Sequence, residues 1–175
     1  MQNLISEQQN TEQPSTEQRN TEHANDPELK CIMVSLNTLT IALPIDRVEK
    51  IIKQTSVFGS GLTHLGLTHY EGSPITVIDL HYQLFQTRQI ESSDNGYLII
   101  AQTITQNRLA LPIKEPPNLI EFPISRQRVI PQSYRGADTL WMATHVVRIA
   151  QPAGELLTVF MIDIDYLAER CIAQS

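Results

Sequence analysis

Short apolar runs separated by turn residues make up the chain from residue 30 onward. The runs are rich in Val, Ile, Leu and Thr, which is typical of β-strands. The predicted strands cover residues 31–36, 39–45, 75–80, 97–104, 108–113, 141–149 and 156–164. The first two, and likewise the fourth and fifth, are joined by connections short enough for β-hairpins. The pattern therefore predicts a mostly β protein.

Two segments between these runs are less regular. In residues 46–53, the apolar positions 48, 51 and 52 suit a turn of helix, but the place of this segment after a strand also permits a third strand. Residues 123–140 contain two prolines and a glycine, so we expect a loop there.

Two motifs occur twice in the same order. Ala42-Leu43-Pro44-Ile45 recurs letter for letter as residues 110–113, and the Val-Ile-Asp segment at 77–79 is echoed by Met-Ile-Asp at 161–163. The second pair lies further apart than the first, so we expect the additional residues of the second half in 123–140. Because both motifs recur in the same order, the sequence predicts two similar strand-rich halves.

Each Ile-Asp step is expected to end a strand and begin a short helix. Asp79 and Asp163 can accept hydrogen bonds from exposed amides of the following turn, as N-cap residues do. Because both occupy the same place in the repeat, capping explains them better than a catalytic carboxylate pair. The second of these helices would be C-terminal.

Residues 1–28 differ from the rest of the chain. They are strongly polar and contain a degenerate five-residue repeat over 10–24. Such a segment buries too little apolar surface to offset the entropy of ordering, so we predict a disordered polar tail over 1–28 and a folded domain over 29–172. A flexible tether or a partner-binding peptide is the functional alternative for the tail.

Charge and composition exclude several classes of protein. The tail carries six acids and one base, whereas the remaining residues carry 13 acids and 12 bases and are nearly neutral. A neutral domain lacks the basic surface that nucleic acid requires, so we expect no nucleic-acid partner. No apolar run approaches the length needed to span a bilayer, and the start of the chain lacks the features of a secretory signal. Two distant cysteines without a CxxC motif fit a reducing cytoplasm.

Reaction machinery is not visible in the sequence. The glycines form no phosphate-binding loop, and His64 and His69 have no carboxylate or cysteine in metal-ligand register. Ser73 lacks the small-residue elbow of a hydrolase nucleophile. We therefore expect an interaction module with no cofactor, no metal and no catalytic residue, whose binding surfaces are sheet edges and apolar grooves.

The ordered motifs from residue 30 to residue 169 resemble the CheW-like domain. The resemblance rests on a hairpin ending in Ala-Leu-Pro-hydrophobic, a V-x-E-I segment, a G-hydrophobic-x-N-L-R-G segment and a strand closing with Val-Ile-Asp-Leu. The corresponding stretches here are residues 42–45, 48–51, 66–72 and 74–80.

This resemblance implies a fold and a role. The fold would be mostly β, with two small five-stranded β-barrel subdomains packed side by side and short helices after the Ile-Asp motifs and at the C-terminus. The barrels would cover roughly 39–90 and 96–165, with the N-terminal strand and the C-terminal helix open to exchange between them. The protein would be a non-catalytic cytoplasmic adaptor, recruited to membrane-associated receptor arrays without inserting into the membrane. It would couple the cytoplasmic tip of a methyl-accepting chemoreceptor to the regulatory domain of a CheA-like histidine kinase in chemotaxis, phototaxis or pilus-motility signalling.

The same resemblance suggests two partner surfaces. The residues expected to face the kinase are Ile45, Val48, Glu49 and Ile51. Those expected on the receptor side are Gly66, His69, Tyr70, Glu71 and Gly72. A receptor helix is expected in a groove between the barrels.

One position departs from the family pattern. Glu71 stands where the family has arginine, which inverts the charge and removes a forked hydrogen-bond donor. Either the partner surface has changed sign too, or the protein serves a divergent array, or it competes with a standard adaptor without coupling receptors. The alternative function is that of a regulatory or assembly protein of this fold that binds another partner.

Overall fold

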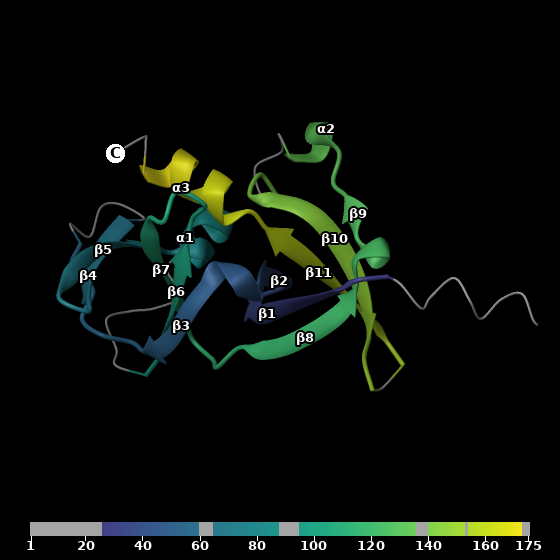
Figure 1. Cartoon of the computed structure of the whole chain (residues 1–175), viewed down its shortest axis with the longest axis horizontal. Helices are drawn as coiled ribbons and strands as arrows, with labels where there is room; N and C mark the ends of the chain where they lie inside the picture. Colours follow the sequence, from purple (N-terminus) through teal and green to yellow (C-terminus); the bar gives the residue numbers. More distant parts are fainter. Residues whose placement is uncertain (1–25, 60–64, 88–94, 136–139, 153, 173–175) are drawn as a thin grey trace, which may run out of the picture.

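The computed structural model describes the chain except residues 1–25, 60–64, 88–94, 136–139, 153 and 173–175. Its strands form two sheets, which lie side by side in Figure 1. In spatial order, the six-stranded sheet contains β8 (Asn118–Pro123), β1 (Glu28–Leu36), β2 (Leu39–Pro44), β11 (Leu156–Ile162), β10 (Ala143–Ala150) and β9 (Arg128–Val129). The five-stranded sheet contains β3 (Val48–Lys53), β6 (Tyr97–Gln102), β7 (Arg108–Ile113), β5 (Ser73–Ile78) and β4 (Leu65–Tyr70).

The helices are short. They are α1 (Leu80–Phe85), α2 (Gln132–Arg135) and α3 (Ile164–Ile172), with 3-10 turns η2 (Ile45–Arg47) and η3 (Ile124–Arg126). The prediction of a mostly β fold with a helix after each Ile-Asp motif is confirmed. Asp79 and Asp163 are N-caps as expected, because each carboxylate accepts a bond of 3.0 Å from the backbone N–H three residues later.

Several local predictions needed correction. Of the two alternatives left open for residues 46–53, the third strand is the one observed, since β3 follows directly after η2. The expected loop over 123–140 contains η3, β9 and α2, and two strands, β4 and β8, were not predicted. Both predicted hairpins are present, as β1–β2 and β6–β7.

The repeated motifs pair reciprocally. β2 runs parallel to β11 with Ala42 opposite Met161, and β7 runs parallel to β5 with Ala110 opposite Val77. Each Ala-Leu-Pro-Ile strand therefore lies beside the Ile-Asp strand of the other half. The sheets do not follow the division of the chain into 39–90 and 96–165, because the first hairpin joins the six-stranded sheet and β6–β7 joins the five-stranded one.

Both sheets curl. A flat six-stranded sheet would hold its edge strands β8 and β9 about 24 Å apart, because neighbouring strands lie about 4.8 Å apart. The chain from Pro123 to Arg128 can span at most about 18 Å, so the edges must approach each other. In the five-stranded sheet, Phe58, after β3, forms a bridge to Leu67 of β4 with N–O distances of 2.7 and 2.6 Å.

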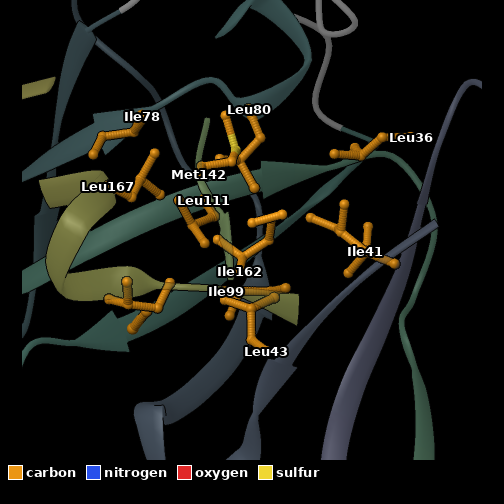
Figure 2. Packing of buried hydrophobic residues seen from close by; sticks show 14 of the residues in the cluster. Leu36, Ile41, Leu43, Ile78, Leu80, Ile99, Leu111, Met142, Ile162 and Leu167 are labelled. Atoms are coloured by element: carbon orange, nitrogen blue, oxygen red, sulfur yellow. The ribbon is translucent and has the colours of Figure 1, made fainter. Parts of the chain in front are cut away.

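The core has three parts that follow from this curling. Alternate residues of each sheet face an inner cluster, which includes Ala42 in the six-stranded sheet and Ala110 in the five-stranded sheet. The strand residues that alternate with these inner residues point to the opposite face of each sheet, where they form a larger cluster shared by both sheets and the helices. Leu43 and Leu111, from the two copies of the repeat, are both fully buried in this shared core (Figure 2). The two copies therefore have equivalent surroundings.

The boundary of the predicted tail falls partly on described residues. Glu28 begins β1, the carbonyl of Pro27 accepts a 2.9 Å bond from Ile124 N, and the Asp26 carboxylate accepts from the Ser125 hydroxyl. Residues 1–25 of the tail prediction lie outside the described part of the chain.

Candidate functional site

The residues expected to face the kinase lie on η2 and β3, at one edge of the five-stranded sheet. Ile45 and Ile51 are 41% and 36% exposed. Val48 instead packs against the shared core, because a register irregularity between Val48 and Lys50 shifts the alternation of side chains. Ile45, Glu49 and Ile51 are thus the members of this set that a partner could contact.

The residues expected on the receptor side form the β4–β5 hairpin. Tyr70 pairs with Ser73, and the two residues between them, Glu71 and Gly72, have φ angles of +51° and +79°. Two successive positive φ values are typical of the tight turns that suit β-hairpins. His69 and Glu71 are exposed.

Two other residues of this set are packed inside the protein. Tyr70 is buried in the inner cluster of the five-stranded sheet. Gly66 faces Val57 so closely that an added Cβ would lie 2.5 Å from the valine Cγ1. The exposed part of the predicted receptor set is therefore His69 together with the turn at Glu71 and Gly72.

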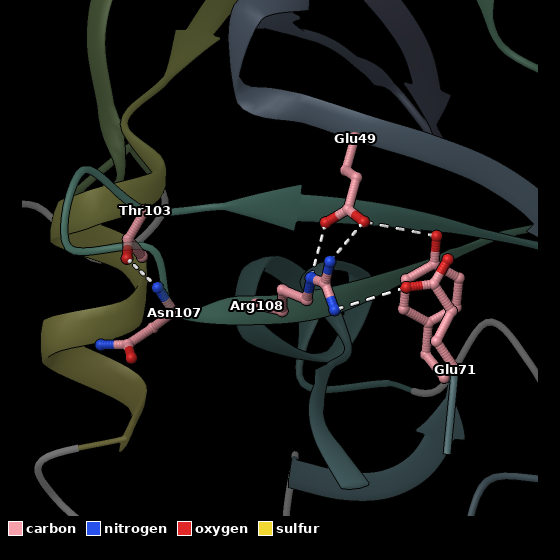
Figure 3. A network of polar contacts seen from close by, with 6 residues as sticks. Glu49, Glu71, Thr103, Asn107 and Arg108 are labelled. Atoms are coloured by element: carbon pink, nitrogen blue, oxygen red, sulfur yellow. Dashed lines mark hydrogen bonds and ion pairs between the residues drawn. The ribbon is translucent and has the colours of Figure 1, made fainter. Parts of the chain in front are cut away.

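Arg108, at the start of β7, connects the two predicted surfaces (Figure 3). Its Nε and Nη2 donate to the two carboxylate oxygens of Glu49 at 2.7 and 2.8 Å, which is a forked, bidentate ion pair. Its Nη1 lies 3.5 Å from a carboxylate oxygen of Glu71. A single guanidinium therefore contacts β3 and the β4–β5 turn.

Tyr70 completes this network. Its hydroxyl donates to Glu49 Oε1 at 3.5 Å, and the Arg108 guanidinium lies 5.5 Å from the centre of its ring. Burial raises the pKa of Tyr70, and the nearby Glu71 and Glu49 carboxylates raise it further. The phenol is therefore neutral at physiological pH and can serve as a donor to Glu49.

An open groove of about 1070 Å³ begins beside this network. Its walls are the start of β5, the β6–β7 turn and α3, and Arg108 is among its lining residues. Ile104 and Ile172 contribute exposed apolar side chains to two of the walls. The lining starts at Ser73, so the predicted receptor segment 66–72 adjoins the groove and does not line it.

Asp165 fixes α3 against the groove. Its carboxylate accepts a 2.6 Å bond from Ile104 N in the β6–β7 turn and forms an ion pair of 3.1 Å with Arg47 of η2. The same acidic residue thus holds the helix, the turn and the start of the β3 surface together.

Neither metal-binding nor membrane-spanning features occur in the described residues. No group of three or more His, Cys, Asp or Glu side chains there could hold a metal ion. No helix among those residues is long and apolar enough to cross a bilayer.

A family model described as the CheW-like domain matches residues 30–170. The chain belongs to the CheW-like domain family. Among solved structures, the protein is similar to the scaffolding protein TtCheW from Thermoanaerobacter tengcongensis, with a TM-score of 0.65, 17% sequence identity, and coverage of 83% of this chain and 90% of that one. Comparison with curated protein sequences gives no match. The match of the family model confirms the family prediction. CheW-like proteins are a family of non-catalytic scaffolds of chemotaxis signalling.

Two parts of this site were not predicted from the sequence. Arg108 was assigned to a strand but not to a surface, because its carboxylate partner Glu49 lies 59 positions away in the sequence. The groove was expected only in general terms, since its walls come from three separate segments. The one available signal was that Arg108 is a charged residue two positions before the repeated apolar motif.

Proposed function

We propose that this CheW-like protein is an adaptor that couples the cytoplasmic tip of a chemoreceptor to the regulatory domain of a CheA-type histidine kinase. The main support for this proposal is that the model of a scaffold family matches most of the chain. The proposal is supported by the Arg108 guanidinium, which contacts Glu49 of the segment predicted to face the kinase and Glu71 of the segment predicted to face the receptor. In this role the protein works in membrane-associated receptor arrays and catalyses nothing.

The exposed chemistry of each surface suits its proposed partner. The proposed kinase surface is formed by η2 and the edge strand β3, and each has one exposed isoleucine, Ile45 and Ile51, that can be buried against an apolar patch of the regulatory domain. The groove beside α3 is lined by the exposed apolar side chains of Ile104 and Ile172, by Ser, Thr, Gln and Asn side chains, and by the charged Arg108, Asp165 and Glu169. An amphipathic receptor helix fits such a groove by placing its apolar face inside and its polar face along the rim.

Calorimetric titration with the CheA-type regulatory domain tests the kinase side. We expect a dissociation constant of roughly 1 micromolar, about −8 kcal/mol, because transient signalling interfaces are commonly weak. Ile51→Glu should weaken this binding about ten-fold by placing a charge in the apolar contact. The matched control is Leu119→Glu, which changes an exposed leucine on an edge strand of the other sheet and should leave binding unchanged. Absence of binding by the wild-type protein at tens of micromolar would refute the kinase partner.

A second candidate function is favoured by Glu71, which stands where the family has arginine. A regulatory or assembly protein of this fold would bind a different partner and would not couple receptors. Glu71→Arg distinguishes the two functions, since a gain in receptor binding indicates a coupler with an altered surface, whereas no change indicates another partner. Because the new arginine would face Arg108, the substitution should be measured alone and together with Arg108→Gln.

A further inference from the structure

We propose that Arg108 is a positioning residue shared by the two docking surfaces, so that its loss weakens the binding of both partners together. This inference rests on the proposed function and names the residue that links its two halves. Arg108 belongs to neither predicted partner set and contacts one member of each, Glu49 and Glu71.

The geometry of the guanidinium allows one side chain to hold two segments. Nε and Nη2 form the fork on Glu49, which leaves Nη1 to face Glu71 from the other side of the group (Figure 3). A lysine at this position would present one point charge and could not reproduce the fork. The contact therefore depends on arginine itself, not only on a positive charge.

Arg108 is itself held in place on two sides. It follows the β6–β7 turn, which is closed by a 3.0 Å bond from Asn107 N to the Thr103 hydroxyl oxygen. The aromatic ring of Tyr70 lies under its guanidinium. A side chain anchored in this way can fix the position of the groups that it contacts.

The charges explain why removal should disturb both surfaces. Two carboxylates approach the same guanidinium, and without it Glu49 and Glu71 would be like charges on neighbouring segments. The β4–β5 turn and β3 would then be expected to move apart. In the described part of the chain, the remaining ion pairs, Lys30–Glu121 and Arg47–Asp165, do not join these two segments.

Other contacts hold the middle of β4. The backbone bridge between Phe58 and Leu67 and the 2.9 Å bond between the hydroxyls of Thr55 and Thr68 connect β4 to the segment that follows β3. These contacts should keep the sheet folded when Arg108 is replaced. The effect of the replacement should therefore be confined to the turn end of the hairpin and to β3.

The test compares the affinities of variants for two separate probes, the CheA-type regulatory domain and a chemoreceptor cytoplasmic-tip fragment. Arg108→Gln should weaken both about five-fold, which corresponds to the loss of a partly exposed forked ion pair. Arg108→Lys should give a smaller loss for both. Ile51→Glu should affect only the kinase domain and His69→Glu only the receptor fragment. Lys30→Gln removes a cation of the other sheet that pairs with Glu121 at 3.6 Å, and it should affect neither.

The outcomes separate this inference from the proposed function. If wild-type protein binds both probes but Arg108→Gln weakens only one or neither, the shared role is refuted and the adaptor function stands. If wild-type protein binds neither probe, the adaptor function is refuted and the inference falls with it.

Amide hydrogen exchange gives a readout that needs no partner. Arg108→Gln should speed exchange in residues 49–51 and 70–73 relative to Lys30→Gln, with unchanged circular dichroism. Equal exchange in the two variants would overturn the positioning role.

Discussion

Truncating either repeated leucine should destabilise the whole domain, not one sheet. Leu43 and Leu111 come from different halves of the chain and different sheets, and both are completely buried in the shared core. If the two sheets fold as one unit through this core, Leu43→Ala and Leu111→Ala should have similar effects and should leave a single unfolding transition.

The expected magnitude follows from the burial of these side chains. A buried Leu→Ala substitution loses the transfer free energy of the removed atoms and leaves a cavity, at a total cost of about 3–4 kcal/mol. For a domain of this size, each kcal/mol lowers the melting temperature by about 2–4 °C, so we expect a decrease of about 10 °C for each variant. Leu119→Ala is the control, since Leu119 is 60% exposed on β8, and it should change stability by less than about 0.5 kcal/mol.

Two optical probes follow the transition independently. Fluorescence of Trp141, the single tryptophan, reports the shared core in which it is buried, and far-ultraviolet circular dichroism reports both sheets. In wild-type protein and in both leucine variants, the two curves should coincide. Separate transitions, or a large effect of one leucine and a negligible effect of the other, would refute the view that the shared core makes one cooperative unit.

Three further predictions concern buried or closely packed groups. Burial raises the pKa of Cys31 to about 12 and of Cys171 to about 11, so native protein should not react with a thiol reagent at pH 8, whereas denatured protein should show two thiols. Both folded pKa values lie above the ordinary value of 9.0, so keeping the two thiols buried and neutral costs no free energy of unfolding below pH 9. As the pH rises towards 11–12 the unfolded chain loses these protons first, and the free energy of unfolding should fall, which urea unfolding across that range measures. Asp79→Ala and Asp163→Ala should each cost about 1 kcal/mol through loss of the N-cap, while Asp→Asn at the same positions should cost much less. Gly66→Ala should cost about 1–3 kcal/mol in thermal unfolding, because the new Cβ would meet a valine methyl at 2.5 Å, and an unchanged melting temperature would contradict this packing.

Local pattern was enough to predict most of the strands. The strands that were missed lack an apolar alternation for physical reasons. In β4, the buried inward position is taken by Thr68, whose hydroxyl bonds to Thr55 and to the carbonyl of Ser56. β8 ends in a proline and lies at an edge of its sheet, so its side chains alternate less clearly between core and solvent.

The repeat predicted two similar halves but could not predict which strands pair. A parallel pair such as Ala42 with Met161 joins residues far apart in sequence, and its stability comes from tertiary packing that no short window contains. For the same reason the sequence suggested Glu49 and Glu71 as surface residues but gave no sign that Arg108 holds both. The family motifs predicted two separate partner surfaces, but only the folded chain shows that one residue of each, Glu49 and Glu71, contacts the same arginine.

The exchange of hairpins has a consequence for how the docking surfaces are supported. The segments that carry the predicted partner residues, 45–51 and 66–72, belong to the first half of the chain, but the centre of their sheet is the β6–β7 hairpin of the second half. β3 pairs only with β6 in the strand order, and β5 reaches β6 only through β7. Contacts within the first half, the Phe58–Leu67 bridge and the Thr55–Thr68 bond, join β4 to the segment after β3. The two central strands of the sheet and the arginine that contacts both predicted partner segments come from the second half. In this architecture, the reciprocal exchange places the two motifs, which are separated along the chain, on one sheet around strands of the other half.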